Sequence, residues 1–441
     1  MSLLDDVSIV VTPNGYKAGT LYGVLPSSGA ADMDVTRATA ATRVDESGLI
    51  EDVLANVPRI DYTGGGCPHI LAEPQRTNEV TYSSDFSNSY FQKIRSTIST
   101  DQIISPDGTQ NADKFIEDSA LGTKLLWTQD KVVSIGDVLT WSVFAKKGER
   151  DWIVLREANA GNFSAYFDLT NGVIGTSEGV DSSKIEDYGS GWYRCSITYT
   201  TTGTTAKGRL YLADSDNGQS YQGNGTSGLY IWGAQLEEGS YATSYIPTSG
   251  SAVTRNQDLF TRDGIGSLIN STSGSFFIEM AALNQPPGSQ ISISLSGNNS
   301  SDRLLIYASG SGGKWLAQFR KNGVNIVSIE RTTTLTNQSK VAVSWEAGRY
   351  VMYIDGNKAT NYGSGGSETF PTTFDVGDLK NLQFTPNHNS TSNLFFGKVK
   401  QLQVYKTALT DEQLLQLTGE SGTDFYESYA GMASALTYTI Q

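Results

Sequence analysis

The sequence has few of the residues that disulfide frameworks, metal sites and long helices need. Its 441 residues include only two cysteines, Cys67 and Cys195, and two histidines, His69 and His388. Two distant cysteines cannot form a disulfide framework, and there is no CxxC pair to suggest a metal site. Runs of Ala, Leu, Glu and Lys, which favour long helices, are nearly absent. These absences favour β structure.

Charge and long hydrophobic runs are limited as well. Charged residues make up 18% of the chain and the formal net charge is −14, whereas nucleic-acid binding requires clustered Lys and Arg to neutralise phosphates. No stretch approaches the ~20 apolar residues of a membrane helix. The first residues, MSLLDDVSIV, lack the basic and apolar regions of a signal peptide. We therefore expect synthesis in the cytoplasm without an export signal, no nucleic-acid binding and no membrane insertion.

The residues that are abundant indicate short strands joined by tight turns. The chain has 46 Gly, 22 Tyr and 7 Trp, and apolar residues alternate with polar ones as in half-buried sheets. A chain of this length exceeds one hydrophobic core. We predict an all-β fold with a small N-terminal adaptor at 1–75, two antiparallel β-sandwiches at 76–255 and 256–420, and an interaction tail at 421–441. Residues 1–75 have too few apolar residues for a sizeable core, so we expect this adaptor to complete its burial against a neighbour.

One helix is expected, near the end of the second sandwich. Residues 409–417 (LTDEQLLQL) follow the pattern of a capped helix, with Thr410 as the N-cap and Gln413 three positions later. Those two residues form the sequence signature of a capping box.

Several long phrases resemble modules of bacteriophage virion proteins. Residues 36–62 (TRATAATRVDESGLIEDVLANVPRIDY) and 67–80 (CPHILAEPQRTNEV) resemble a recurrent module of those proteins. Residues 141–150 (WSVFAKKGER), 188–195 (YGSGWYRC) and 231–255 resemble the carbohydrate-binding jelly roll that follows it. Residues 350–357 (YVMYIDGN) and 404–417 resemble the hairpin and closing strand-helix of a concanavalin A-like (laminin G-like) domain.

The resemblance implies a non-enzymatic structural protein displayed on the virion, of the fibre or receptor-binding type. Such a protein would assemble as an oligomer of sister chains, which in this family is typically a trimer. It would also contact other virion proteins and host or environmental glycans. Residues 1–75 would then attach it to the particle. Two alternatives stay open: a capsid-associated head fibre or decoration, and a glycan depolymerase.

The motifs of catalysis are missing. No GxSxG, HExxH or P-loop pattern occurs. Cys67 and His69 lie two residues apart, a spacing that does not give a nucleophile and base their in-line geometry. The carboxylates of Glu237 and Glu238 are expected at the solvated surface. We therefore predict that the chain is not an enzyme.

Calcium is the one ion that the sequence leaves open. Asp214, Asp216 and Asn217 resemble the start of an EF-hand loop, but Gln219 stands where that loop needs glycine. A structural Ca²⁺ in an irregular loop stays an open alternative, and no other cofactor is expected.

Glycan binding needs an aromatic ring that stacks on a sugar and polar groups that bond its hydroxyls. Rings near turns are the best candidates for exposure, and polar residues lie close to them in the sequence. The candidate glycan-binding residues are Tyr188, Tyr221, Asp214, Asn217, Asn224 and Trp315.

Four arginines recur in the N-terminal phrases, and their planar guanidinium groups suit carboxylates. This spacing favours salt bridges between subunits or domains over a ligand site. The predicted assembly contacts are Arg37, Arg43, Arg59 and Arg76.

Overall fold

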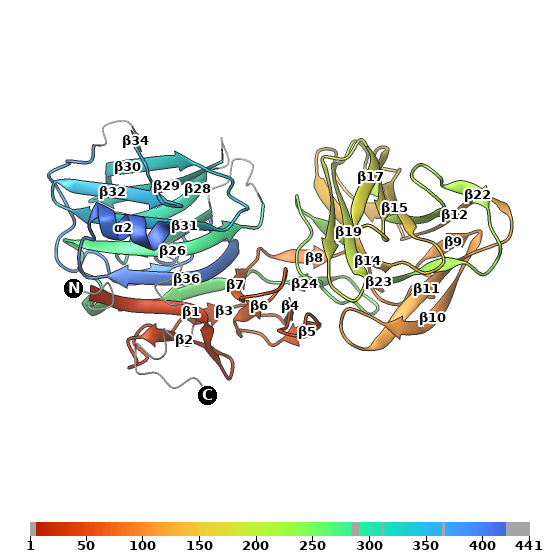
Figure 1. Ribbon diagram of the computed structural model, residues 1–441, viewed down its shortest axis with the longest axis horizontal. Helices are drawn as coiled ribbons and strands as arrows, with labels where there is room; N and C mark the ends of the chain where they lie inside the picture. Colours follow the sequence, from red (N-terminus) through yellow and green to blue (C-terminus); the bar gives the residue numbers. More distant parts are fainter. Residues whose placement is uncertain (1–5, 285–290, 310–312, 364–366, 420–441) are drawn as a thin grey trace.

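The computed structural model describes residues 6–284, 291–309, 313–363 and 367–419, and it shows two antiparallel β-sandwiches joined by a narrower region (Figure 1). The predicted all-β fold class is confirmed. The tail predicted at 421–441 lies outside the described residues. Within the described part, no helix is long and apolar enough to cross a membrane.

The middle sandwich contains two sheets, here called the β14 sheet and the β15 sheet. The β14 sheet has the order β10 (Ser96–Ile104), β11 (Gln110–Glu117), β23 (Gly228–Glu238), β14 (Val138–Lys146), β19 (Trp192–Thr200) and β18 (Ser182–Asp187). The β15 sheet has the order β17 (Val173–Glu178), β16 (Phe163–Asp168), β15 (Trp152–Glu157), β21 (Arg209–Ala213), β12 (Leu121–Trp127) and β22 (Ser220–Gln222), with β9 (Gln92–Ile94) also on β12. A small ladder joins β13 (Lys131–Val132) to β20 (Thr205–Ala206).

Alternation along the strands builds the core of the middle sandwich. Trp141 and Ile197 point inward from the β14 sheet and meet Ile153 and Leu212 from the β15 sheet, all four fully buried. The intervening residues point outward, as the two-residue period of a strand requires. Each sheet therefore presents an outer face that is free to carry function.

The other sandwich closes around Trp315 and Trp345, which are both fully buried. Its first sheet runs β2 (Thr20–Leu25), β1 (Val7–Lys17), β36 (Gly397–Tyr405), β26 (Gly274–Ala282), β31 (Ser339–Glu346), β32 (Arg349–Ile354) and β33 (Asn357–Lys358), with β7 (His69–Ala72) and β6 (Arg59–Asp61) added at β36. Its second sheet runs β3 (Asp34–Thr36), β25 (Leu259–Arg262), β35 (Asn381–Gln383), β27 (Ile291–Ser296), β28 (Arg303–Ser309), β29 (Lys314–Lys321), β30 (Val324–Thr332) and β34 (Asn361–Tyr362).

The predicted helix is present as α2 (Asp411–Thr418), which ends one residue before the end of the described residues. Thr410 and Gln413 form the expected capping box, each side chain bonding the other residue's backbone N–H. A single 3₁₀ turn, η1 (Gly266–Leu268), follows β25.

The N-terminal region differs from the separate adaptor that the sequence predicts. Strand β1 pairs with β36 across almost the whole chain, with Val10 opposite Gln403. Ile9, Val11 and Leu21 are buried in the core of the C-terminal sandwich. This segment has too few apolar residues to form a core of its own. It is therefore stable only as strands of a larger sheet. Residues 1–75 therefore complete their burial against a neighbour, as expected, but as part of the C-terminal sandwich and not as a separate adaptor.

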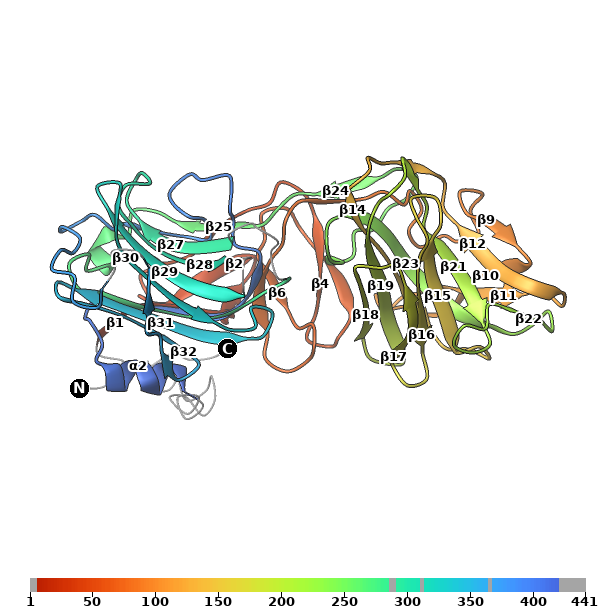
Figure 2. The ribbon, with the colours of Figure 1, turned by 90° about the horizontal axis from the view of Figure 1, so that it is seen from above.

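The middle sandwich is inserted into the chain of the other one, between β7 and β25. The two connections, β8 (Arg76–Asn78) and β24 (Val253–Arg255), form an antiparallel pair with Val253 opposite Asn78. The hairpin β4 (Ala41–Val44) and β5 (Ile50–Val53) lies between the two sandwiches (Figure 2). These elements make up the junction.

Candidate functional site

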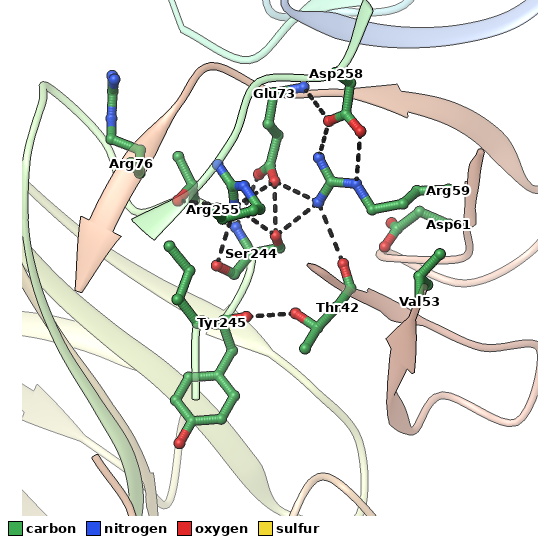
Figure 3. A network of polar contacts seen from close by, with 12 residues as sticks. Thr42, Val53, Arg59, Asp61, Glu73, Arg76, Ser244, Tyr245, Arg255 and Asp258 are labelled. Carbon is green, nitrogen blue, oxygen red and sulfur yellow. Dashed lines mark hydrogen bonds and ion pairs between the residues drawn. The ribbon is translucent and has the colours of Figure 1, made fainter. Parts of the chain in front are cut away.

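A buried network of charges holds the junction together (Figure 3). Arg37 Nη1 lies 2.7 Å from Asp258 Oδ1, and the other oxygen of Asp258 bonds Arg59. Arg59 Nη1 lies 2.6 Å from Glu73 Oε2, which also takes a contact of 2.8 Å from Arg255 Nη1. All five side chains are buried. The network links the N-terminal strands to both connections of the inserted sandwich.

The network stays charged despite its burial. Burial alone would raise the pKa of Glu73, but Arg255 and Arg59 hold that pKa well below its usual range. Burial also opposes the charge of Arg59, yet Asp258 and Glu73 raise its pKa. Glu73 further accepts bonds from the backbone N–H and the hydroxyl of Ser244, at 2.8 and 2.6 Å. The junction is therefore fixed by directional, charge-assisted bonds.

Arg37 and Arg59 form salt bridges between parts of one chain, which is one of the two alternatives that the sequence leaves open, and not between subunits. Arg37 and Arg59 are fully buried and bond within the chain, so they are not available to a sister chain. Arg43 is half-buried and pairs with Glu51 at 2.6 Å. Arg76 is also half-buried, with its guanidinium 5.8 Å from the Tyr241 ring. A role of Arg43 and Arg76 in assembly stays a prediction.

A cleft of about 510 Å³ lies at the junction, between the two sandwiches and the β4–β5 hairpin. Its size is typical of pockets for small ligands, about 300–1,000 Å³. The outer face of the β14 sheet contributes Ser182, Lys184, Tyr188, Ser196 and Thr198. The opposite walls contain Ser240, Tyr241, Thr243, Asn284, Thr336 and Lys398.

The cleft lining combines hydroxyl groups and charged side chains with three tyrosines, of which Tyr188 and Tyr241 are half-buried and Tyr245 is buried. Tyr188 packs edge-on against Phe144 at 4.9 Å between ring centroids and is half-buried. Tyr241 is half-buried as well, on the loop that carries Ser244 of the network. Hydroxyls that donate and accept, next to an aromatic surface, match the groups that a sugar presents. The cleft can therefore hold a polar, ring-shaped ligand.

Tyr188 is the one predicted glycan-binding residue that lines this cleft. Tyr221 is buried instead, because β22 turns its ring into the core, where its hydroxyl donates to Glu117 at 2.8 Å. Its ring lies under the charged groups of Lys124 and Arg150. Trp315 is fully buried in the core of the other sandwich. The predictions for Tyr221 and Trp315 as exposed platforms are wrong.

The three polar candidates are exposed but do not meet at the cleft. Asn217 donates to the Thr176 hydroxyl at 3.1 Å. Asn224 caps its own turn, its Oδ1 accepting the backbone N–H of Thr226 at 2.9 Å. Asp214 accepts a bond from the hydroxyl of the adjacent Ser215 at 3.2 Å. Their observed contacts stabilise turns.

The titratable residues singled out in the sequence have structural partners. His69 is buried with its Nε2 3.1 Å from Asp61 Oδ1, and burial lowers the pKa of His69, while Cys67 is exposed. Glu237 is not at the surface as expected: it is fully buried and accepts the Thr243 hydroxyl at 2.6 Å. In the described residues, no group of three or more His, Cys, Asp and Glu side chains is placed to hold a metal ion.

No protein-family model and no curated protein matches the sequence. Solved structures similar to part of the chain include a CBM40 domain of a Ruminococcus gnavus sialidase bound to α2,3-sialyllactose. That similarity has 17% identity and a TM-score of 0.28, and covers 34% of this chain and 83% of that one. A leech trans-sialidase (20% identity, TM-score 0.28) is matched over 34% of this chain and 24% of its own. A Limulus polyphemus pentraxin (14% identity, TM-score 0.25) is matched over 34% and 75%.

Proposed function

We propose that this chain is a non-enzymatic bacteriophage virion protein of the fibre or receptor-binding type, which assembles as an oligomer and contacts host-surface glycans. One observation carries the proposal. The phrases at 36–62, 67–80 and 231–255, which resemble phage virion proteins, supply four of the five charged residues of one network: Arg37, Arg59, Glu73 and Arg255. Segments far apart in the sequence thus build one junction.

The junction explains how such a protein would present a glycan site. The cleft has walls from both sandwiches and from the β4–β5 hairpin, so it keeps its shape only while the network holds these parts together. A prearranged site binds a flexible polysaccharide without the cost of ordering its own walls. The proposal therefore assigns attachment to the chain as a whole and sugar contact to the cleft.

Filling the cleft is expected to abolish sugar binding. Ser182 is an exposed cleft residue, so Ser182→Trp places a large ring in the ligand space without disturbing a core. On an array of bacterial capsular polysaccharides and O-antigens, we expect the wild-type chain to bind at least one polysaccharide and the variant to bind it at least tenfold more weakly. Ser220→Trp, at an exposed position on β22 outside the cleft, is the matched control and should bind as the wild type does. Equal binding by Ser182→Trp would remove the cleft from the proposal.

Placement on the virion is tested by gold-labelled antibodies against this chain on purified phage particles. Labelling at the tail tip is the expected result. Labelling over the head would instead favour the capsid decoration, and the absence of label on particles would refute a virion role. Shortened polysaccharide chains after incubation with the purified protein would refute the non-enzymatic assignment.

A further inference from the structure

The outer face of the β15 sheet carries an unusual row of side chains. Trp127 on β12 lies opposite Arg209 on β21, and Arg209 lies opposite Arg156 on β15. Ser164 on β16 continues the row beyond Arg156. Neighbours of Trp127, Arg156 and Arg209 along each strand point into the core, so the row faces outward. We call these four residues the arginine row.

The two arginines form no close ion pair, although the buried carboxyl of Glu157 interacts electrostatically with Arg209. Like charges directly opposite each other on neighbouring strands are unfavourable, and neither guanidinium lies within 4.0 Å of a carboxylate in the described part of the chain. Arg156 Nη2 donates to Asn162 Oδ1 at 2.5 Å, and Arg209 Nη2 donates to Asn159 Oδ1 at 2.7 Å. These amide oxygens are neutral, so they orient the two forks without compensating their charge.

Part of each guanidinium also lacks a hydrogen-bond partner. The Nε atoms of Arg156 and Arg209 are both buried and donate to no partner among the described residues. A buried donor without a partner costs about 1–3 kcal/mol. Because these two atoms are buried, an anionic ligand would bond the Nη groups of the two half-buried arginines instead.

Aromatic side chains surround the row. Trp127 and Trp152 are half-buried at the edge of a cluster formed by Leu125, Val154, Tyr166, Tyr211 and Ala213 on the same outer face. An indole ring beside guanidinium forks offers both contacts that a charged sugar needs: a stacking surface for its ring and a bidentate partner for its carboxylate.

We propose that the arginine row binds an acidic saccharide, with its carboxylate between Arg156 and Arg209 and its ring against Trp127. The site lies on the sheet opposite the cleft, and none of its residues lines the cleft. It is therefore a second binding site, and its test is independent of the proposed function.

The test uses isothermal titration of the full chain with four carboxylate-bearing probes: oligosaccharides of polygalacturonate, alginate, hyaluronate and polysialic acid. Dextran oligosaccharides are the neutral probe. We expect at least one acidic probe to bind, more weakly at high salt, and dextran not to compete for the site. Arg156→Gln/Arg209→Gln should lower the affinity at least tenfold, whereas Ser182→Trp should leave it unchanged.

The chain offers a matched control for this double substitution. Arg303 and Arg320 face each other on β28 and β29 of the other sandwich, and their Nε atoms also lack a partner. Ser296 and Asn325 stand on either side of them, with no aromatic ring in the row. Arg303→Gln/Arg320→Gln therefore removes the same charge and should leave binding intact. Arg156→Lys/Arg209→Lys keeps the charge but not the planar fork, and should bind between the wild type and the glutamine variant. It also serves as the test if the glutamine variant does not fold.

Three results would overturn the proposal. The first is a wild-type chain that binds none of the acidic probes. The second is affinity that survives in both the glutamine and the lysine variants. The third is equally tight binding of polyglutamate, which would assign the row to an acidic peptide.

Discussion

Replacing Asp258 with alanine is expected to lower the stability of the junction by about 3–5 kcal/mol. Its two carboxylate oxygens pair with Arg37 and Arg59, and one of them also accepts the backbone N–H of Glu73 at 2.9 Å. Removing this carboxylate leaves Arg37 buried without its ion-pair partner, and leaves Arg59 with Glu73, which it shares with Arg255. The change is measured by native-state hydrogen exchange at the paired amides of β8 and β24, whose opening reports the junction.

The control is a charge pair of the same region that remains in water. Glu51 is 41% exposed at its side chain and pairs with Arg43 at 2.6 Å. Glu51→Ala should cost less than about 1 kcal/mol, as exposed pairs usually do. Equal losses for Asp258→Ala and Glu51→Ala would mean that the buried network does not hold the junction.

Acidification from pH 7 to pH 4 is expected to raise the free energy of unfolding of the middle sandwich by about 3 kcal/mol, through protonation of Asp113. Burial raises the pKa of Asp113 to about 6, against bonds from the backbone N–H groups of Asp101 and Phe86 that lower it. Because the folded pKa lies above the usual 3.8, the folded state takes up the proton first and gains stability as the pH falls through 6. A difference of about two pH units corresponds to about 3 kcal/mol.

The comparison is made with Asp113→Asn, which removes this titration. The free energy of unfolding of the wild type relative to the variant should rise as the pH is lowered from 7 to 4, and the carboxyl of Asp113 should titrate near pH 6 by NMR.

For Asp61, the change of stability with pH has the opposite sign. Burial would raise its pKa, but His69 and backbone N–H groups lower that pKa to about 2. The stability that Asp61 contributes is therefore complete above about pH 4 and lost as the pH falls toward 2. Titration of Asp113 near pH 4 would contradict the first prediction.

The sequence was sufficient for the strands but not for their partners. Alternation predicted strands in both sandwiches, and the pair Thr410 and Gln413 predicted the start of α2, because these signals are local. The pairing of Val10 with Gln403 is not local. Nothing in the first 75 residues specifies which edge they join, so the N-terminal region was predicted as a separate adaptor.

The functional residues show the same limit. The repeated arginines predicted salt bridges, but their partners, Glu73 and Asp258, lie in other segments and carry no signal of their own. Proximity to a turn predicted exposure for both Tyr188 and Tyr221. Only Tyr188 lines the cleft. The ring of Tyr221 is buried in the core, where its hydroxyl bonds Glu117 and its face contacts the charged groups of Lys124 and Arg150. Which face a ring takes depends on the register of its strand, and the sequence alone does not fix the register.

The paired connections β8 and β24 have a mechanical consequence. A load applied to the middle sandwich is shared by two covalent strands that run side by side, and one cut in either strand leaves the sandwich tethered by the other. Because Asn78 and Val253 are neighbours, the module between them begins and ends at one point. A different module whose ends also meet could replace it without disturbing the strands of the C-terminal sandwich. The C-terminal sandwich and the junction are therefore suited to carry different inserted domains at the same position.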